Sequence, residues 1–259
     1  MKLTFLGTGT STGVPQPRCS CRTCASSDPR DKRLRASVLV ETDGRRLLID
    51  CGPDFRWQIL RVGSPDIDAL LLTHIHYDHV GGIDDLRPWC RDGHDFDIHC
   101  TADVERDLRE RIPYCFAEHP YPGVPSFRMR RVERDKPFEA AGVEVVPLPV
   151  MHYMLPIIGF RIGPLAYITD AKTVPDSTVA LMRGVDTLVV NALRLREHLS
   201  HMNLEQALAI ARRVGARRTL LTHMSHDMPP HAEVALPAGV ELAFDGLEVE
   251  IKTCTASAK

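Results

Sequence analysis

The sequence predicts an α/β protein that forms a single domain over residues 1–259. Short runs rich in Val, Ile and Leu, bounded by Gly, Pro or Asp, recur along the chain and predict strands. Segments between them carry apolar residues at helical spacing, which predicts helices. Strands and helices that mix along one chain are typical of α/β architectures. The length suffices for one large core, and we find neither a repeat nor a low-complexity linker.

The predicted strands are short and mostly apolar. They cover residues 3–6, 37–41, 46–50, 69–73, 143–147, 157–162, 165–169, 187–191, 219–222 and 240–244. Several are continuously apolar, such as the run Leu70, Leu71 and Leu72. Because both faces of such a strand are apolar, we expect it to be buried on both sides.

The clearest predicted helix covers residues 203–214. Asn203 can cap its first turn, and Gln206 stands three residues later, as in a capping box. Gly215 follows the last apolar position and is typical of a helix end. Further helices are expected at 102–112 and 175–183.

Two segments differ in composition from the rest of the chain. Residues 91–140 are charged, rich in Pro and weakly periodic, which predicts an insertion or lid on the one domain. The last residues, 253–259, are expected to be frayed.

The overall composition excludes several classes of protein. Hydrophobic residues make up 44% and charged residues 25%, so the chain is neither disordered nor fibrous. The net charge of −2 provides no positive field, so we expect no nucleic-acid or membrane partner. No apolar run approaches the ~20 residues that span a bilayer. The first residues lack a signal-peptide core, so we expect a cytoplasmic protein.

A dense group of imidazoles follows the apolar run at 69–73. His74, His76 and His79 stand with Asp78 inside six residues. Burying this group without a partner would be costly. Neutral imidazoles with a carboxylate suit zinc, manganese or iron. Because side chains alternate in an extended chain, His74 and His76 should point the same way, while Asp78 and His79 in the following turn can address a second metal.

Further candidate ligands follow other predicted strands: His152, Asp170 and His223. Open α/β sheets build their sites from residues at strand ends. Each residue alone could be an ordinary polar cap, but the whole set predicts a metal site.

These residues resemble the metallo-β-lactamase superfamily. HIHYDH at 74–79 fits its H-x-H-x-D-H signature, and LIDCG at 48–52 is similar to its second-strand motif. The resemblance implies an αββα sandwich with two divalent metal ions, Mn²⁺ or Zn²⁺, at one edge. It implies that one metal is held by His74, His76 and His152, the other by Asp78, His79 and His223, with Asp170 bridging. Asp50 could orient these ligands or simply form a turn before Gly52.

The eight cysteines should be reduced in a chain of this size without an export signal. Cys19, Cys21 and Cys24 form C-x-C-x-x-C in the loop at 14–30, a partial site for tetrahedral zinc. His226 is the expected fourth ligand. A zinc ion with four protein ligands has no position left for water, so this site would be structural. The alternative is three ordinary reduced thiols.

This cysteine motif narrows the resemblance to the PhnP-type phosphodiesterases, which act on phosphoribosyl cyclic phosphate. The resemblance implies that His201 lies over the metals as a general acid or phosphate contact, with His198 as the alternative. It makes His201 and Asp78 the catalytic candidates, and it implies a homodimer.

The leading hypothesis is therefore a dinuclear phosphodiesterase that cleaves a small, cyclic phosphodiester by attack of a metal-bridging hydroxide. A ribonuclease Z-like tRNA 3′-processing enzyme shares the metal motif. A carboxylic ester, lactone or thioester hydrolase could use the same fold. A non-hydrolytic protein resembling pyrroloquinoline-quinone biosynthesis protein B is the alternative from another class.

Overall fold

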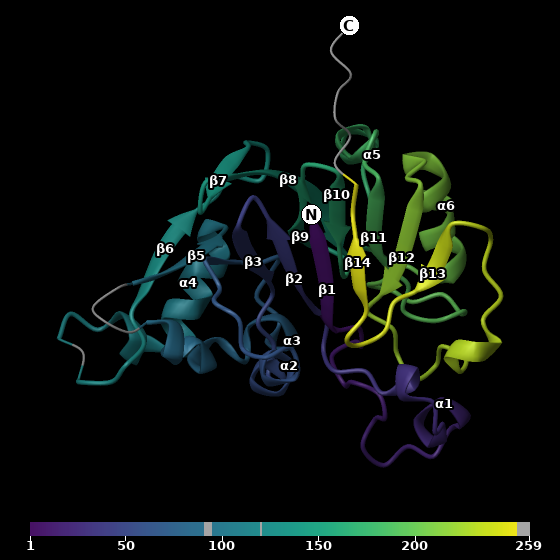
Figure 1. The fold of residues 1–259 in the computed structure, drawn as a ribbon, viewed down its shortest axis with the longest axis horizontal. Coiled ribbons are helices and arrows are strands. Elements are labelled where there is room, and N and C mark those ends of the chain that lie inside the picture. Colours follow the sequence, from purple (N-terminus) through teal and green to yellow (C-terminus); the bar gives the residue numbers. More distant parts are fainter. Residues whose placement is uncertain (91–94, 120, 253–259) are drawn as a thin grey trace, which may run out of the picture.

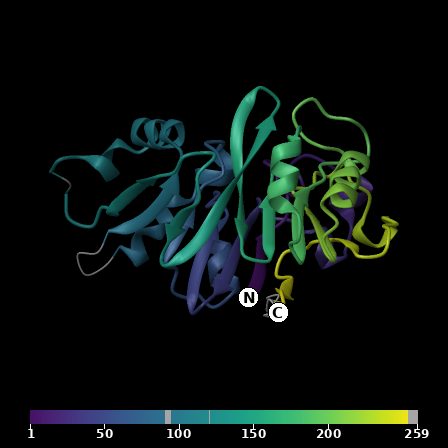
Figure 2. The ribbon, with the colours of Figure 1, turned by 90° about the horizontal axis from the view of Figure 1, so that it is seen from above.

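Two β-sheets packed face to face form the centre of the molecule. The structure is a computed structural model that describes residues 1–90, 95–119 and 121–252. Within these residues each sheet has seven strands, and helices cover both outer faces (Figures 1 and 2). The arrangement confirms the predicted αββα sandwich.

The first sheet has the order β14-β1-β2-β3-β4-β5-β6. Its strands are β1 (Lys2–Gly7), β2 (Ser37–Thr42), β3 (Arg45–Ile49), β4 (Ala69–Leu71), β5 (Phe96–Cys100), β6 (Phe127–Arg131) and β14 (Glu248–Glu250). The second sheet has the order β13-β12-β11-β10-β9-β8-β7. Its strands are β7 (Phe138–Ala140), β8 (Val143–His152), β9 (Leu155–Ile162), β10 (Leu165–Ile168), β11 (Thr187–Asn191), β12 (Arg218–Thr222) and β13 (Val240–Leu242).

The helices are short. The α-helices are α1 (Arg22–Ala25), α2 (Phe55–Arg61), α3 (Tyr77–Val80), α4 (Ala102–Arg111), α5 (Asp176–Met182) and α6 (Leu204–Val214). The 3₁₀ helices are η1 (Pro29–Asp31), η2 (Ile83–Trp89), η3 (Pro113–Phe116) and η4 (His231–Glu233). No helix in the described part of the chain is long and apolar enough to cross a membrane.

The strand alternation explains why four layers form. On β3 and β4, Leu47 and Leu71 enter the core between the sheets, while Leu48 and Leu70 enter the core beneath the helices. Side chains of a strand point to opposite faces, so a continuously apolar strand supplies two cores at once. The expected burial of the run at 70–72 on both faces is confirmed.

The predicted capped helix is present as α6. Gln206 donates its backbone N–H to Asn203 Oδ1 at 2.9 Å, and Asn203 donates its own to Gln206 Oε1 at 3.2 Å. Gly215 ends the helix at φ +70°, in the left-handed region that glycine tolerates.

Part of the segment 91–140 continues the first sheet, and its expected role as an insertion or lid stays a prediction. Its strands β5 and β6 extend the first sheet, and Asp97 of β5 pairs with Arg128 and Arg130 of β6. One face of these strands is partly solvated and carries charged residues between the apolar ones. These charged residues made the strands hard to recognise in the sequence. Some residues lie outside those that the structure describes: 91–94, 120, and the tail 253–259, which includes Cys254.

Strand direction determines where the site forms. Strands β3 to β6 are mutually parallel, and so are β10 to β13. Strand β8 shares the direction of β10, since both are antiparallel to β9. The residues that follow β8, β10 and β12 therefore emerge at one edge of the second sheet.

Candidate metal centre

The structure brings together all seven predicted ligands from four separate chain segments. Two groups form, and within each group the ligand atoms lie within 4.8 Å of one another. The first group is His74, His76, His152 and Asp170, and the second is Asp78, His79, Asp170 and His223. This division is the one that the superfamily resemblance implies, and metal coordination itself stays a prediction.

Asp170 belongs to both groups because its two oxygens face different ways. Oδ1 lies 3.1 Å from His223 Nε2 and 3.3 Å from His79 Nε2. Oδ2 lies 3.7 Å from His74 Nε2 on the side of the first group. A carboxylate placed in this manner can bridge two cations.

The imidazoles are oriented by groups behind them. Buried Asp50 accepts a hydrogen bond from His79 Nδ1 at 2.7 Å and another from the backbone N–H of Thr73 at 2.9 Å. His152 donates its Nδ1–H to the carbonyl oxygen of Ser200 at 2.8 Å. In both histidines the Nε2 atom is left free to act as a ligand.

Several buried imidazole nitrogen atoms of the centre lack a hydrogen-bond partner within the part of the chain that the structure describes, and this shows whether a cation would fit there. His79 Nε2, His223 Nδ1 and His223 Nε2 have no hydrogen-bond partner among the described residues. Buried polar atoms normally have partners, so three such atoms within this cluster call for a ligand. A divalent cation fits the two Nε2 atoms, since both lie beside Asp78 and Asp170 carboxylate oxygens at 3.1 to 3.5 Å.

The carboxylates of the centre are held in the ionised form. Burial opposes the ionisation of Asp170, but His223 and His79 outweigh it and hold its pKa well below its usual range. Burial likewise opposes the ionisation of Asp78, and His79 and His223 outweigh it there, so its pKa is also lowered. Both groups are therefore negative, as cation ligands need to be.

Three residues of this site have backbone angles in the left-handed region. Asp50, Asp170 and His223 have φ values of +61°, +55° and +56°. Each non-glycine residue in this region costs about 1–3 kcal/mol and tends to mark a functional site. Asp50 follows β3 directly, and its hydrogen bond with His79 Nδ1 is the contact by which it would orient that ring.

His201 reaches the metal centre and His198 lies behind it. His201 Nε2 is 3.2 Å from Asp170 Oδ2, and its ring stacks on His223 with centroids 5.0 Å apart. The contacts described for His198 are with Ser200 and with His201 Nδ1, the latter at 3.3 Å. The geometry favours His201 over His198 as the residue that would meet a substrate.

The cysteine motif meets His226 as expected. Sγ of Cys19 and Sγ of Cys21 lie 3.2 and 3.5 Å from His226 Nδ1, and with Cys24 the four atoms lie within 4.8 Å of one another. Burial raises the pKa of the Cys21 thiol, but hydrogen bonds with the Cys24 backbone N–H and with His226 have the larger, opposite effect. Together they lower this pKa to about 6. The loop at 14–30 is thereby placed next to the segment that carries His223.

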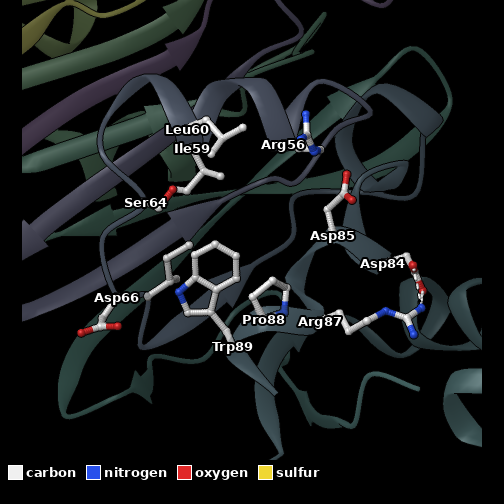
Figure 3. A pocket seen from close by; sticks show the side chains of 11 residues that line it. Arg56, Ile59, Leu60, Ser64, Asp66, Asp84, Asp85, Arg87, Pro88 and Trp89 are labelled. Atoms are coloured by element: carbon white, nitrogen blue, oxygen red, sulfur yellow. Dashed lines mark hydrogen bonds and ion pairs between the residues drawn. The ribbon is translucent and has the colours of Figure 1, made fainter. Parts of the chain in front are cut away.

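A cavity beside α2 and η2 is separate from the metal centre. About 790 Å³ lies between α2 and η2, lined by residues such as Ile59, Leu60, Pro88 and Trp89 (Figure 3). None of the residues of the metal centre lines it. The histidine cluster is therefore not at the base of this cavity.

Two supporting residues escaped the sequence analysis. Thr73 holds Asp50, and the carbonyl of Ser200 holds His152 from 48 residues away. Thr73 directly precedes the ligand candidate His74 in the sequence, but its hydrogen bond to Asp50 depends on the fold. A backbone carbonyl leaves no signal in the sequence.

Comparison with known proteins decides the family. The family described as "Beta-lactamase superfamily domain" matches residues 45–224. The chain belongs to the metallo-β-lactamase superfamily. A crystal structure of a new diphosphatase from the PhnP family is 42% identical and superimposes with a TM-score of 0.90 over 98% of both chains. The predicted PhnP-type resemblance is confirmed.

Two curated relatives carry other names. An octanoyltransferase of Porphyromonas gingivalis is 44% identical over 97% of this chain, but the chain spans only 52% of that protein. A ribonuclease Z of Mycobacterium sp. (strain KMS) is 27% identical over 97% of this chain and 96% of its own length. The superfamily fold implies divalent metals, and the two clusters supply residues that could hold them.

Proposed function

We propose that this member of the superfamily is a dinuclear metal-dependent phosphodiesterase that acts on a small, cyclic phosphodiester. The observation that carries the proposal is Asp170, whose two oxygens face two separate groups of ligands. The 42% identity to a PhnP-family diphosphatase supports chemistry at phosphorus.

The two metals, Mn²⁺ or Zn²⁺, would supply an activated water and neutralise charge on the phosphoryl oxygens. Asp50 and the Ser200 carbonyl hold the rings of His79 and His152 with Nε2 toward the centre. Asp78 contributes a carboxylate that stays ionised in this buried site.

His201 acts in this proposal on the leaving group. Its Nε2 lies at the centre beside Asp170, and its Nδ1 lies 3.0 Å from Ser200 Oγ. From this position it can donate a proton to the departing alkoxide or hold a phosphoryl oxygen.

The cysteine group is assigned a third, structural zinc. Three sulfur atoms and one imidazole complete a tetrahedral set, which leaves no position for water. The bound ion would stabilise the fold rather than take part in the reaction.

Ribonuclease Z activity is the second candidate, because a ribonuclease Z is 27% identical over nearly the whole chain. Against it, the net charge of −2 offers no broad cationic surface for a polyanion.

A substrate screen on metal-loaded protein tests the proposal. It compares phosphoribosyl 1,2-cyclic phosphate, bis(p-nitrophenyl) phosphate, a carboxylic ester and precursor tRNA, with elemental analysis of the same sample. We expect hydrolysis of the small diesters and about three metals per chain. Full metal loading without any diester hydrolysis would contradict the proposal, and selective cleavage of tRNA at low enzyme concentration would favour the second candidate.

A further inference from the structure

A buried amide side chain binds the backbone next to Asp170. Asn191 is the last residue of β11 and is fully buried. Its Oδ1 accepts a hydrogen bond from the Ala171 N–H at 2.9 Å, and its Nδ2 donates to the Ala171 carbonyl oxygen at 3.0 Å. We call these two bonds the Asn191 clamp. Only one orientation of the amide makes both, because its oxygen must face the N–H group and its NH₂ must face the carbonyl.

The clamp lies where the ladder between β10 and β11 ends (Figure 1). The two strands pair in parallel as far as Ile168 and Val190. Asp170 then has φ +55°, in a region that favours glycine, and the chain bends there. An amide side chain carries the same donor and acceptor as a peptide group, so Asn191 bonds to Ala171 as a neighbouring strand would. The clamp therefore fixes the bend that directs the Asp170 carboxylate.

The Ala171 carbonyl oxygen also binds the loop that carries His201. Met202 donates its N–H to this oxygen at 2.9 Å. The Met202 carbonyl oxygen accepts in turn from the Leu193 N–H, also at 2.9 Å. Leu193 lies two residues after Asn191, so one short stretch of chain holds both Ala171 and Met202.

The residues linked in this way stand beside two side chains of the centre. Asp170 directly precedes Ala171, and His201 directly precedes Met202. The two side chains meet, with His201 Nε2 at 3.2 Å from Asp170 Oδ2. The bond between Met202 and Ala171 is therefore one residue away from this contact on both sides. A shift of the Ala171 carbonyl would move the backbone that carries both side chains.

We propose that Asn191 is a positioning residue that sets the separation between Asp170 and His201. This inference rests on the proposed phosphodiesterase function and adds a residue that acts through two others. Because Asn191 holds the Ala171 carbonyl and this carbonyl holds Met202, the clamp keeps His201 beside the bridging carboxylate. A misplacement of about 1 Å at a reacting centre can cost about 10²-fold in rate.

Asn191→Leu tests the clamp, because it keeps the approximate shape of the side chain and removes both bonds. Gln58→Met is the matched control. Gln58 is likewise a fully buried amide, and it donates to a backbone carbonyl, that of Arg35, at 2.7 Å. Both substitutions remove a buried amide, so a loss of stability alone should appear in both. Thermal melting measures this loss, and Asn191→Ala provides a second variant with a smaller side chain.

Metal affinity gives a readout that is independent of turnover. Asp170 belongs to both ligand groups, so a displaced carboxylate should weaken the binding of both active-site metals together. Outer groups that orient ligands contribute roughly 10- to 100-fold to metal affinity. In competition with a chelator, Asn191→Leu should lose both metals at a concentration lower by about this factor, whereas Gln58→Met should lose them as the wild-type protein does. Equal retention by the two variants would overturn the proposal.

Turnover at saturating metal tests the part of the proposal that concerns His201. Asn191→Leu should lower kcat by up to about 10²-fold and change KM little, with a smaller loss for a nitrophenolate leaving group. In a His201→Ala background the same substitution should cost far less, because the residue through which it acts is already absent. Equal losses in both backgrounds would show that Asn191 does not act through His201.

Two further outcomes separate the clamp from the fold and from the reaction. If both Asn191 variants fail to fold while Gln58→Met folds, the clamp serves folding alone and the proposal is overturned. If the wild-type protein hydrolyses no diester, the proposed function fails, and the chelator measurement then still decides whether Asn191 positions Asp170.

Discussion

Replacing Asp50 by Asn tests whether the centre depends on the group behind its ligands. The substitution keeps the size of the side chain, and asparagine tolerates the φ of +61°. Asp50 is fully buried and accepts a bond from His79 Nδ1 at 2.7 Å, which holds the His79 ring with Nε2 toward the centre. The amide can keep the bond from the Thr73 N–H, but it then turns its NH₂ group toward His79.

The expected loss follows from this geometry. His79 would shift its proton to Nε2 or lose its orientation, and outer groups of this kind contribute roughly 10- to 100-fold to metal affinity, or about 1.4–2.8 kcal/mol. His79 belongs only to the group with Asp78, Asp170 and His223. The variant should therefore lose one of its two active-site metals at a lower chelator concentration than the other.

Competition with a chelator, followed by elemental analysis, measures this affinity. Asp43→Asn is the matched control, since Asp43 also has positive φ, at +51°, but is exposed in the turn between β2 and β3. An Asp50→Asn protein that retains both metals as tightly as the control would refute the orienting role of Asp50.

Four further predictions follow from the same structure. Asp170→Ala should remove both active-site metals together with activity, which elemental analysis checks; retention of both ions would contradict bridging. His201→Ala should keep its metals and lower kcat by roughly 10²- to 10⁴-fold, with a smaller loss for a nitrophenolate leaving group; an equal loss for all leaving groups would point to phosphate positioning instead. Cys21→Ser should lower zinc content and Tm more than turnover per folded molecule, and an unchanged Tm would exclude a structural site. Burial lowers the pKa of His99 to about 4, so its contribution to stability is present above the unfolded value of ~6.5 and is lost as pH falls toward 4. His99→Phe, which retains an aromatic ring against Phe138, should therefore lose less Tm than the parent between pH 7 and pH 5.

The local parts of the protein were predictable from sequence. The run from His74 to His79 contains four of the seven candidate ligands, and it was recognisable because these four are neighbours along the chain. Asn203, Gln206 and Gly215 predicted both ends of α6, since capping involves only residues within a few positions. Strands with two apolar faces predicted a layered α/β fold.

Strands at the edge of the first sheet were harder to recognise. Strand β6 carries Arg128 and Arg130 on a solvated face, and its apolar residues were too few to give a clear period. Its place in the sheet depends on pairing with β5, about thirty residues earlier in the chain. Such pairing depends on tertiary packing rather than on local propensity.

The sequence by itself determined which atoms could serve as ligands: imidazoles, carboxylates and thiols in recognisable spacings. Only the tertiary structure decided how they point. The two oxygens of Asp170, the bond from His79 to Asp50 and the meeting of Cys19 with His226, 207 residues away, all depend on strands brought side by side. The physical reason is that ligand chemistry belongs to single residues, whereas orientation arises from backbone strain and hydrogen bonds between distant segments.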